Sequence, residues 1–440
     1  MRSTSPRPRR GGQKGRERAA RSARMRPSSQ LSDAELLELV QRQTFRYFWE
    51  FGHPKSGLAR DRMDPRNDSG LDIVVSGGSG FAVMAIIAAV ERNWITRDEA
   101  LDRLTKMIGF LLAADSYHGM LPHFLNGATG KTIHFSRKDD GGDLVETAYL
   151  IVAFLCARQY FTGDSAKERG LRGSIKRLWE DAEWSWHTRD GGNALYWHWS
   201  PNNGWSVNFE IRGWNECLIA YVLAASSPTY AIEPRVYHKG WAQGQDFRNG
   251  RDFYGIELPL GPDFGGPLFF TQYSFLGLDP RGLKDRYADY WRQNLHHTLI
   301  NREHCVRNPN HFAGYGPNSW GLTACDGPRN YDAFAPDKDM GVIAPTAALS
   351  SFPYTPEYSL AALRHYYGAL GKHLWRDYGF VDAFCEAENW YAATHLAIDQ
   401  GPIIIMIENY RTGLFWKLFM SCAEIREGLR RLGFESPHLA

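Results

Sequence analysis

The sequence predicts an all-α protein whose helices pair into an (α/α)6 barrel, a toroid in which long loops at one end form a substrate cleft. About ten to twelve segments repeat their apolar residues at helical spacing. The connections at 115–142, 187–212, 228–280 and 302–355 are long and carry most of the Gly, Pro, Trp, His and Asp outside the helices. Long loops of this kind in a compact domain are usually functional. No strict sequence repeat is visible, so the barrel is predicted from the helix count alone.

The helices are predicted in order from their caps and their apolar spacing. The first follows Ser32, which begins a capping sequence that ends at Glu35, and Thr96 begins a second capping box. Further helices are expected at 80–91, 96–113, 143–160, 167–186, 213–225, 283–300, 356–369, 402–420 and 422–432, with short strands near 131–135 and 194–199. No Pro-rich or Ser/Gly-rich linker divides 31–436, so we expect a single domain there.

Charge is distributed unevenly along the 440 residues. Residues 1–30 hold ten basic residues and one acidic residue, a balance of +9, so the other 410 residues carry −7 of the overall +2. The basic tail at 1–30 is expected to be disordered, with a nucleic-acid or membrane-surface arm as the alternative. Because the remainder is mildly acidic, it lacks the electrostatic footprint of a nucleic-acid-binding protein.

Composition excludes several classes of protein. Aromatic residues make up 14% of the chain, which is too many for a disordered protein or a collagen-like fibre. The six cysteines lie far apart without a CxxC pair, so no disulfide framework is expected. No run reaches the ~18 apolar residues of a membrane span. The basic N-terminus lacks an apolar signal core, so a cytoplasmic protein is predicted from the sequence as written.

Four carboxylates crowd the start of the helix predicted at 143–160. Asp139, Asp140, Asp143 and Glu146 fall within eight residues, after Lys138. Asp143 and Glu146 have the spacing of a structural capping box, but this does not account for Asp139 and Asp140. Carboxylates at a helix N-terminus have a lowered pKa, which suits a base, an electrostatic stabiliser or an acceptor of sugar hydroxyls.

Two further carboxylates stand beside apolar helices. Glu216 is expected to open the apolar helix at 213–225, where burial would raise its pKa and make it a general acid; the alternatives are an ion pair with Arg212 or a helix cap. Asp399 is expected on the loop that leads to a helix beginning at Pro402, where it could instead accept backbone N–H groups. Glu408 and Arg411 have the spacing of a structural ion pair.

Aromatic residues stand in polar loops instead of at helical spacing. Flat rings with polar edges are typical of sugar-binding clefts. No phosphate loop, dinucleotide fingerprint, HExxH or GxSxG motif is present, and the histidines have no metal-ligand spacing, so neither metal nor cofactor is expected. Acid/base chemistry by carboxylates in an aromatic cleft remains, which is typical of glycoside hydrolysis. These aromatics are Trp197, Trp199, Trp205, Trp214, Phe269, Phe270, Tyr273, Trp320, Trp390 and Tyr410.

Several long motifs resemble the glycoamylase-like family, which contains glycoside hydrolase family 144, the bacterial endo-β-1,2-glucanases. They are KDDGGDLVETAYL, GWNECLIAYVLAASSP, GPLFFTQYSFLGLDPRGLKD, GVIAPTAALSSFPYTPE and AIDQGPIIIMIENYRTGLFW, in that order. The resemblance implies an (α/α)6 barrel without metal that hydrolyses linear β-1,2-glucan to sophoro-oligosaccharides, acting within the chain and inverting the anomer. The acidic positions essential in that family match Asp139, Asp143, Glu146, Glu216 and Asp399.

On this basis Glu216 is the expected general acid, and Asp399 is the expected base, acting on water directly or through a substrate hydroxyl. Asp139, Asp143 and Glu146 are expected to bind sugar hydroxyls or hold the proton path. The expected substrate-binding residues are His123, Lys138, Asp140, Trp197, Trp199, Trp214, Tyr273, Tyr410 and Arg411.

Alternatives stay open. An exo-acting enzyme that releases sophorose or trims other β-glucans, a glucan-binding module without catalysis and a nucleic-acid-associated protein acting through its tail are each possible from the sequence. The partner expected is a β-glucan, with no nucleic acid or membrane span and a monomeric chain. Family members are mostly exported, so periplasmic or secreted location is the alternative to the cytoplasm.

Overall fold

The structure is a computed structural model that describes residues 27–440 except 68, 245 and 246. The first 26 positions of the predicted disordered tail lie outside the described residues, and Ser28–Gln30 at its end form one 3-10 turn. The α-helices are α1 Asp33–Glu50, α2 Ser76–Glu91, α3 Arg97–Leu111, α4 Leu144–Tyr160, α5 Ala166–Glu180, α6 Leu218–Ser226, α7 Pro234–Val236, α8 Tyr290–Arg307, α9 Pro345–Leu349, α10 Pro356–Gly368, α11 Gly371–Leu374, α12 Ala397–Thr412, α13 Leu414–Met420 and α14 Ala423–Arg431.

Short strands supplement the helices and pair in antiparallel fashion. They are β1 Arg62–Met63, β2 Ile73–Val75, β3 Phe124–Asn126, β4 Thr132–Ile133, β5 Gly142–Asp143, β6 His198–Trp199, β7 Arg248–Phe253, β8 Ile256–Leu260, β9 Ala324–Cys325, β10 Asp332–Ala333, β11 Trp375–Arg376, β12 Gly379–Phe380, β13 Phe384–Cys385, β14 Trp390–Tyr391 and β15 His395–Leu396. Most of these sheets have two strands, and the sheet β2–β3–β4 has three.

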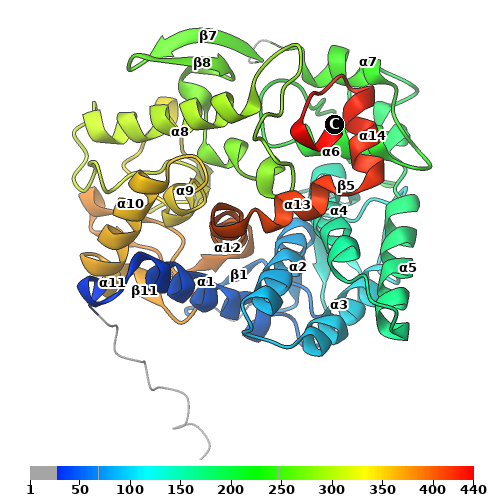
Figure 1. The fold of residues 1–440 in the computed structure, drawn as a ribbon, viewed down its shortest axis with the longest axis horizontal. Coiled ribbons are helices and arrows are strands. Elements are labelled where there is room, and N and C mark those ends of the chain that lie inside the picture. The colour runs from blue at the N-terminus through cyan, green and yellow to red at the C-terminus, as the bar shows by residue number, and fades with distance from the viewer. Residues whose placement is uncertain (1–26, 68, 245–246) are drawn as a thin grey trace, which may run out of the picture.

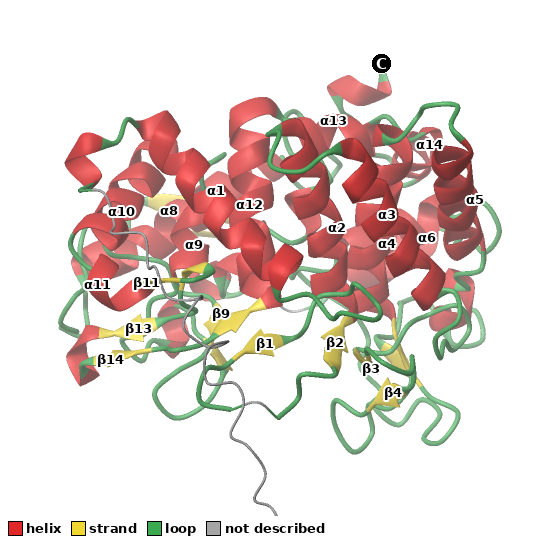
Figure 2. Cartoon of the chain, turned by 90° about the horizontal axis from the view of Figure 1, so that it is seen from below, coloured by secondary structure: helices red, strands yellow, loops and turns green. Residues whose placement is uncertain are grey.

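The helices lie around the molecule, with α12 inside (Figure 1). Helix α2 packs against α4 and α12, and α12 also contacts α1 and α9. Many of the short strands gather with long loops on one side of the helices (Figure 2). The predicted mostly helical fold, with decorated loops at one end, is therefore the observed arrangement.

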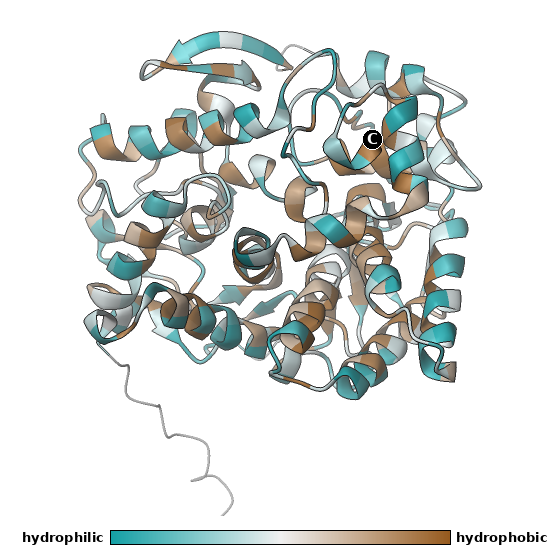
Figure 3. Ribbon diagram, viewed as in Figure 1, coloured by the Kyte–Doolittle hydropathy of each residue, from teal (hydrophilic) through white to brown (hydrophobic). Residues whose placement is uncertain are grey.

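Four helices are buried on nearly every side. In α2, α4, α6 and α12 almost all residues are inaccessible to solvent, and apolar residues dominate each. By contrast α3, α5 and α14 bury one apolar stripe and expose a charged face (Figure 3). A helix that is apolar all round must be enclosed by others, whereas an amphipathic helix lies at the surface. The chain therefore has an inner and an outer set of helices.

Helix boundaries follow local chemistry. Ser32 and Thr96 form the two capping boxes that the sequence predicts. The helix expected at 283–300 begins instead at Tyr290, because Asp289 accepts the N–H of Arg292 and caps it. The segment expected as one helix at 402–420 divides into α12 and α13, because Gly413 has a left-handed φ of 67° that ends the first helix.

Other expectations are corrected in the loops. The segment expected as a helix at 167–186 is helical only to Glu180, and a separate 3-10 turn follows at Trp184–Thr188. The predicted loop at 228–280 contains the β7–β8 hairpin, the longest strand pair in the described chain. The strands expected near 131–135 and 194–199 are present as the shorter β4 and β6. None of the helices formed by the described residues has the length and apolar character needed to cross a membrane.

Two strand pairs bring distant loops to the ends of interior helices. The β5–β6 pair places Asp143, at the start of α4, opposite His198. The β1–β15 pair joins Arg62 to Leu396, immediately before α12. Both pairs lie where an interior helix begins, so the starts of α4 and α12 are surrounded by loop residues.

Candidate active site

Asp143 is held through both of its carboxylate oxygens. It caps α4, where its Oδ1 accepts the N–H groups of Val145 and Glu146, each at 2.9 Å. Its Oδ2 accepts Nε1–H of Trp197 at 3.0 Å and lies 3.3 Å from Nδ1 of His123. Burial acts to raise the pKa of Asp143, but the hydrogen bond and charge of His123 and these N–H donors outweigh it and lower the pKa. Asp143 is therefore a fixed anion.

Glu146 does not complete the predicted capping box. Its Oε2 accepts the N–H of Gly77 at 2.5 Å, from the first turn of α2, and the N–H of Asp143 donates to the carbonyl of Leu121 instead. Burial raises the pKa of Glu146 to about 7, because the positive charge of His123 only partly offsets the loss of water. Glu146 can therefore exchange a proton near neutral pH.

His123 supplies the positive charge of this group. Burial alone would lower its pKa, but the carboxylates of Glu146, Asp143 and Asp139 raise it to about 9. Asp139 lies within reach of Nε2 of His198, at 3.3 Å, and burial together with the charge of Asp143 raises its pKa to about 6. The group thus holds three carboxyl groups around one imidazolium.

Glu216 stands just before α6, which begins at Leu218, and not within an apolar helix as the sequence predicts. Its side chain is only partly exposed, and its backbone carbonyl accepts the hydroxyl of Ser274. Arg212, the alternative partner, pairs with Glu210. Burial raises the pKa of Glu216 to about 7, so the protonated form is well populated at neutral pH.

Asp399 lies in the first turn of α12, which begins five residues before the expected start at Pro402. Pro402 has no N–H to bond the carbonyl of Ile398, and the hydroxyl of Tyr273 donates to that carbonyl instead, at 3.3 Å. The backbone carbonyl of Asp399 accepts Oγ1–H of Thr346 at 2.8 Å. Tertiary donors therefore allow the helix to extend past its proline.

Asp382 is a site residue that the sequence analysis missed. Asp382 and Asp399 are each 1% exposed, and the interaction between their carboxyl groups contributes to the pKa shift of both. Asp382 Oδ2 accepts the N–H of Asp326 at 2.6 Å, while Oδ1 of Asp382 and Oδ2 of Asp399 have no other protein donor. Burial and the charge of Asp382 raise the pKa of Asp399 well above its usual range, whereas burial and the charge of Asp326 raise the pKa of Asp382 to about 7. The two acids therefore share a proton.

Tyr273 connects the two carboxylate groups. Its ring packs edge-on against Phe81 and Tyr149, and it is almost fully buried. Burial raises its pKa well above the usual range, and the charges of both Asp399 and Glu216 contribute. The hydroxyl of Tyr149 donates to the carbonyl of Glu216, so Glu216 and the start of α12 that carries Asp399 both adjoin one buried aromatic cluster.

Other predicted binding residues lie near the site in structural roles. Asp140 is buried and accepts the side-chain amides of Asn202 and Asn203, so it ties a loop together. Lys138 is exposed and donates to the carbonyl of Ser206 at 3.3 Å. Trp199 packs edge-on against His118, beside the exposed Trp186.

Three predicted binding residues lie away from the site. Trp214 is buried in the core against Trp241 and Tyr290. Tyr410 lies at the far end of α12, about 16 Å along the helix from Asp399 at 1.5 Å per residue. Arg411 donates to Glu38 and Gln41, whereas Glu408 pairs with Arg92, so the predicted Glu408–Arg411 pair is wrong.

Known proteins similar to the chain are carbohydrate-active. A family model described as putative glucoamylase matches residues 208–423. An endo-β-1,2-glucanase from Chitinophaga pinensis, solved with sophorotriose and glucose, is 52% identical over 93% of this chain and 100% of its own, with a TM-score of 0.91. A putative glucoamylase from Bacteroides uniformis is 59% identical over 93% of this chain and 99% of its own, with a TM-score of 0.91.

A curated relative has a different mode of action. The exo-β-1,2-glucooligosaccharide sophorohydrolase (non-reducing end) of Parabacteroides distasonis is 44% identical over 423 residues, which are 91% of this chain and 58% of that protein. The chain therefore spans less than two thirds of the length of this relative.

Proposed function

Because the chain belongs to the glycoamylase-like family, in the group of glycoside hydrolase family 144, we propose that it is an endo-β-1,2-glucanase. Its substrate is linear β-1,2-glucan and its products are sophoro-oligosaccharides. One observation carries the proposal: Glu216, with a pKa raised to about 7, and the start of α12, which carries Asp399 of the proton-sharing pair, adjoin the same buried cluster of Tyr149 and Tyr273. An acid and a base held apart in one site are what hydrolysis with inversion needs.

The proposed mechanism assigns one proton to each side of the linkage. Glu216 donates its proton to the glycosidic oxygen as the bond to the sugar breaks. The Asp382–Asp399 pair accepts a proton from the attacking water, directly or through a substrate hydroxyl. In inverting enzymes the two groups stand ~6.5–9.5 Å apart, or further where a hydroxyl relays the proton.

The first carboxylate group positions the sugar in this proposal. Asp143 is a fully buried, fixed anion, so its part is to orient His123 and Trp197, which contact its Oδ2. Asp139 and Glu146, whose pKa values lie at about 6 and about 7, can each donate or accept a hydrogen bond near neutral pH. None of these steps requires a metal ion.

The fold is proposed as an (α/α)6 barrel formed by residues 31–436 as one domain. The buried helices α2, α4, α6 and α12 would belong to the inner ring, and the amphipathic α3, α5 and α14 to the outer ring. Similarity of the whole chain to the Chitinophaga glucanase supports the assignment.

Incubation of the purified protein with linear β-1,2-glucan, and in parallel with β-1,3-, β-1,4- and α-1,4-glucans, tests the proposal. We expect a ladder of sophoro-oligosaccharides from β-1,2-glucan only, with the anomer inverted when products are followed by NMR at early times. The absence of product from β-1,2-glucan would overturn the proposal.

An exo-acting sophorohydrolase is the second candidate, favoured by the name of the Parabacteroides relative. The Chitinophaga endo-enzyme is matched over its whole chain, whereas the exo-enzyme is matched over 58% of its length, so we place the endo mode first. Release of sophorose alone from the earliest time points would establish the exo mode.

A further inference from the structure

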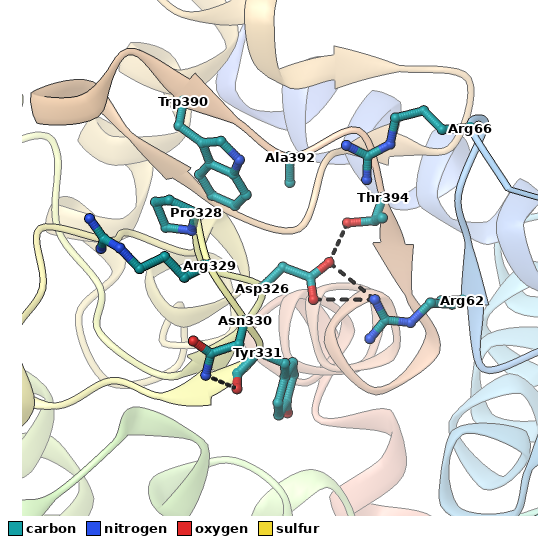
Figure 4. Close-up of a pocket in the computed structure, with 11 residues that line it drawn as sticks. Arg62, Arg66, Asp326, Pro328, Arg329, Asn330, Tyr331, Trp390, Ala392 and Thr394 are labelled. Carbon is teal, nitrogen blue, oxygen red and sulfur yellow. Dashed lines mark hydrogen bonds and ion pairs between the residues drawn. The ribbon is translucent and has the colours of Figure 1, made fainter.

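A cavity of about 300 Å³ is lined by Asp326, the residue whose backbone binds Asp382. Figure 4 shows the residues that line it. Three segments that are far apart in sequence form it, at 62–66, 326–331 and 390–394. Its main side chains are Arg62, Asp326, Pro328, Tyr331, Trp390 and Thr394. The volume is at the lower end of ~300–1,000 Å³ for ligand sites, which suits one or two sugar rings and not a long chain.

Asp326 joins this cavity to the acid pair. Its backbone N–H donates to Oδ2 of Asp382 at 2.6 Å. Its carboxylate accepts Oγ1–H of Thr394 at 2.6 Å. Both carboxylate oxygens lie 3.3 Å from Nη1 of Arg62. A ligand in the cavity is therefore separated from Asp382 by a single residue.

Tyr331 reaches from the cavity toward the same acids. The residue as a whole is 45% exposed. Burial of the phenol raises its pKa well above the usual range, and the charges of Asp399 and Asp382 contribute. Tyr331 therefore lies between the solvent and the acid pair.

The charges of the cavity favour a neutral ligand. Each of its arginines already has a carboxylate partner, so no guanidinium charge is left for an anion. The pairs are Arg62–Asp326 at 3.3 Å, Arg66–Asp64 at 2.9 Å and Arg329–Glu388 at 3.2 Å. Fixed donors and acceptors of this kind suit sugar hydroxyls, and the flat faces of Tyr331, Trp390 and Pro328 suit the C–H face of a pyranose ring.

We propose that this cavity is a glucosyl-binding subsite that holds one sugar unit of the glucan next to the acid pair, with Tyr331 as its stacking platform. The proposal rests on the proposed function and adds the place where the chain is held. The hydroxyls of that unit would bond to the Arg62–Asp326–Thr394 network. The subsite makes cleavage depend on whether the substrate is long enough to fill it.

The test compares substrates that differ by one sugar unit. We would measure kcat/KM for sophorotriose, sophorotetraose and sophoropentaose with the wild type, Tyr331→Ala, Tyr331→Phe and Tyr230→Ala. Tyr230 is the matched control, because it is 40% exposed and does not line the cavity. In the wild type kcat/KM should rise when the substrate becomes long enough to fill the cavity. We expect this rise to be about 3- to 10-fold smaller in Tyr331→Ala. Tyr331→Phe and Tyr230→Ala should keep that rise.

Two kinetic results would overturn the subsite. The first is a Tyr331→Ala enzyme with the length dependence of the wild type. The second is an equal loss at all lengths in both Tyr331→Ala and Tyr331→Phe, because the phenol would then act in the chemistry and not in stacking.

Binding of sophorose by calorimetry separates this proposal from the proposed function. A wild type that cleaves no glucan but binds sophorose, with binding lost in Tyr331→Ala, would leave the subsite in place and remove the hydrolase. A wild type that cleaves β-1,2-glucan, while Tyr331→Ala binds sophorose equally well, would leave the hydrolase in place and remove the subsite.

Discussion

Asp382 and Asp399 are both buried, and the carboxyl group of each shifts the pKa of the other, so the two groups titrate as one unit. One oxygen of each has no other protein donor, and the backbone of Asp326 holds the pair from the Asp382 side. The unit carries one proton when Asp399 is protonated and Asp382 is ionised, and it can take up a second near neutral pH. The proposed base is therefore the pair, and not Asp399 alone as the sequence predicts.

Substitution of Asp382 by Asn should change the pH dependence of catalysis. The new amide can donate to Asp399 and so favours its ionised form, which lowers the pKa of Asp399. We expect the acid limb of kcat/KM to move to lower pH by about 1 unit or more. Because the pair can no longer accept a second proton, kcat should fall by about 10²-fold. An unchanged profile would show that the pair is structural.

The same variant should also alter stability in a defined direction. The pKa of Asp382 is about 7 in the folded protein and ~3.9 for an ordinary Asp, so the folded state binds more protons between these values. Wild-type stability therefore falls as the pH rises from about 4 to about 7, and the neutral Asn removes this loss. Urea unfolding at pH 4.5 and 7.5 should show Asp382→Asn gaining on the wild type at the higher pH. The Asp332→Asn variant, at an exposed ion pair with Lys338, is the control.

Glu216→Gln should abolish the proposed general acid while leaving the glucan-binding residues in place. Loss of a general acid lowers kcat by about 10²–10⁴-fold. The affinity for sophoro-oligosaccharides should stay within about threefold, because the amide has the same shape. Glu210→Gln is the matched control, since Glu210 pairs with Arg212 and Tyr196 nearby and should keep its activity. Equal degradation of glucan by wild type and Glu216→Gln would move the acid role to another carboxyl group.

His123→Asn separates the charge of the imidazolium from its hydrogen bond to Asp143. An Asn amide can still donate to Asp143, but it cannot carry a positive charge. Because the folded pKa of His123 is about 9 and its ordinary value is 6.5, its charge stabilises fully below about pH 6.5. That contribution is lost as the pH rises through about 9. We expect a deficit of about 1–3 kcal/mol at pH 6 that disappears by pH 10, measured by urea unfolding. For comparison, Trp197→Phe removes the other donor to Asp143 Oδ2 without removing a titrating group, so its deficit should vary less between these pH values.

Local sequence predicts the elements whose ends are fixed locally. The capping boxes at Ser32 and Thr96 and the cap at Asp143 can be predicted because each side chain binds backbone groups two or three residues away. Asp382 cannot, because its partner Asp399 comes to it through the tertiary fold. The start of α12 is also hidden, because Tyr273 replaces the hydrogen bond that Pro402 cannot make. Trp214 resembles a loop aromatic in sequence, but the sequence does not show that its ring faces the core.

Gly77 is required where α2 approaches the acids of α4. A Cβ at this position would lie 2.7 Å from Oε2 of Glu146 and 3.0 Å from the ring of Tyr149. Gly77→Ala must therefore displace Glu146 from the N–H that holds it, and we expect a loss of about 1–3 kcal/mol in stability. We also expect activity to fall with the position of Glu146, measured on the folded fraction at low temperature. Gly109→Ala is the control, because its Cβ meets nothing within 4 Å on α3 and an alanine there should stabilise the helix by about 0.4–1 kcal/mol. A Gly77→Ala protein that is as stable and as active as the wild type would mean that Glu146 has no fixed role in the site.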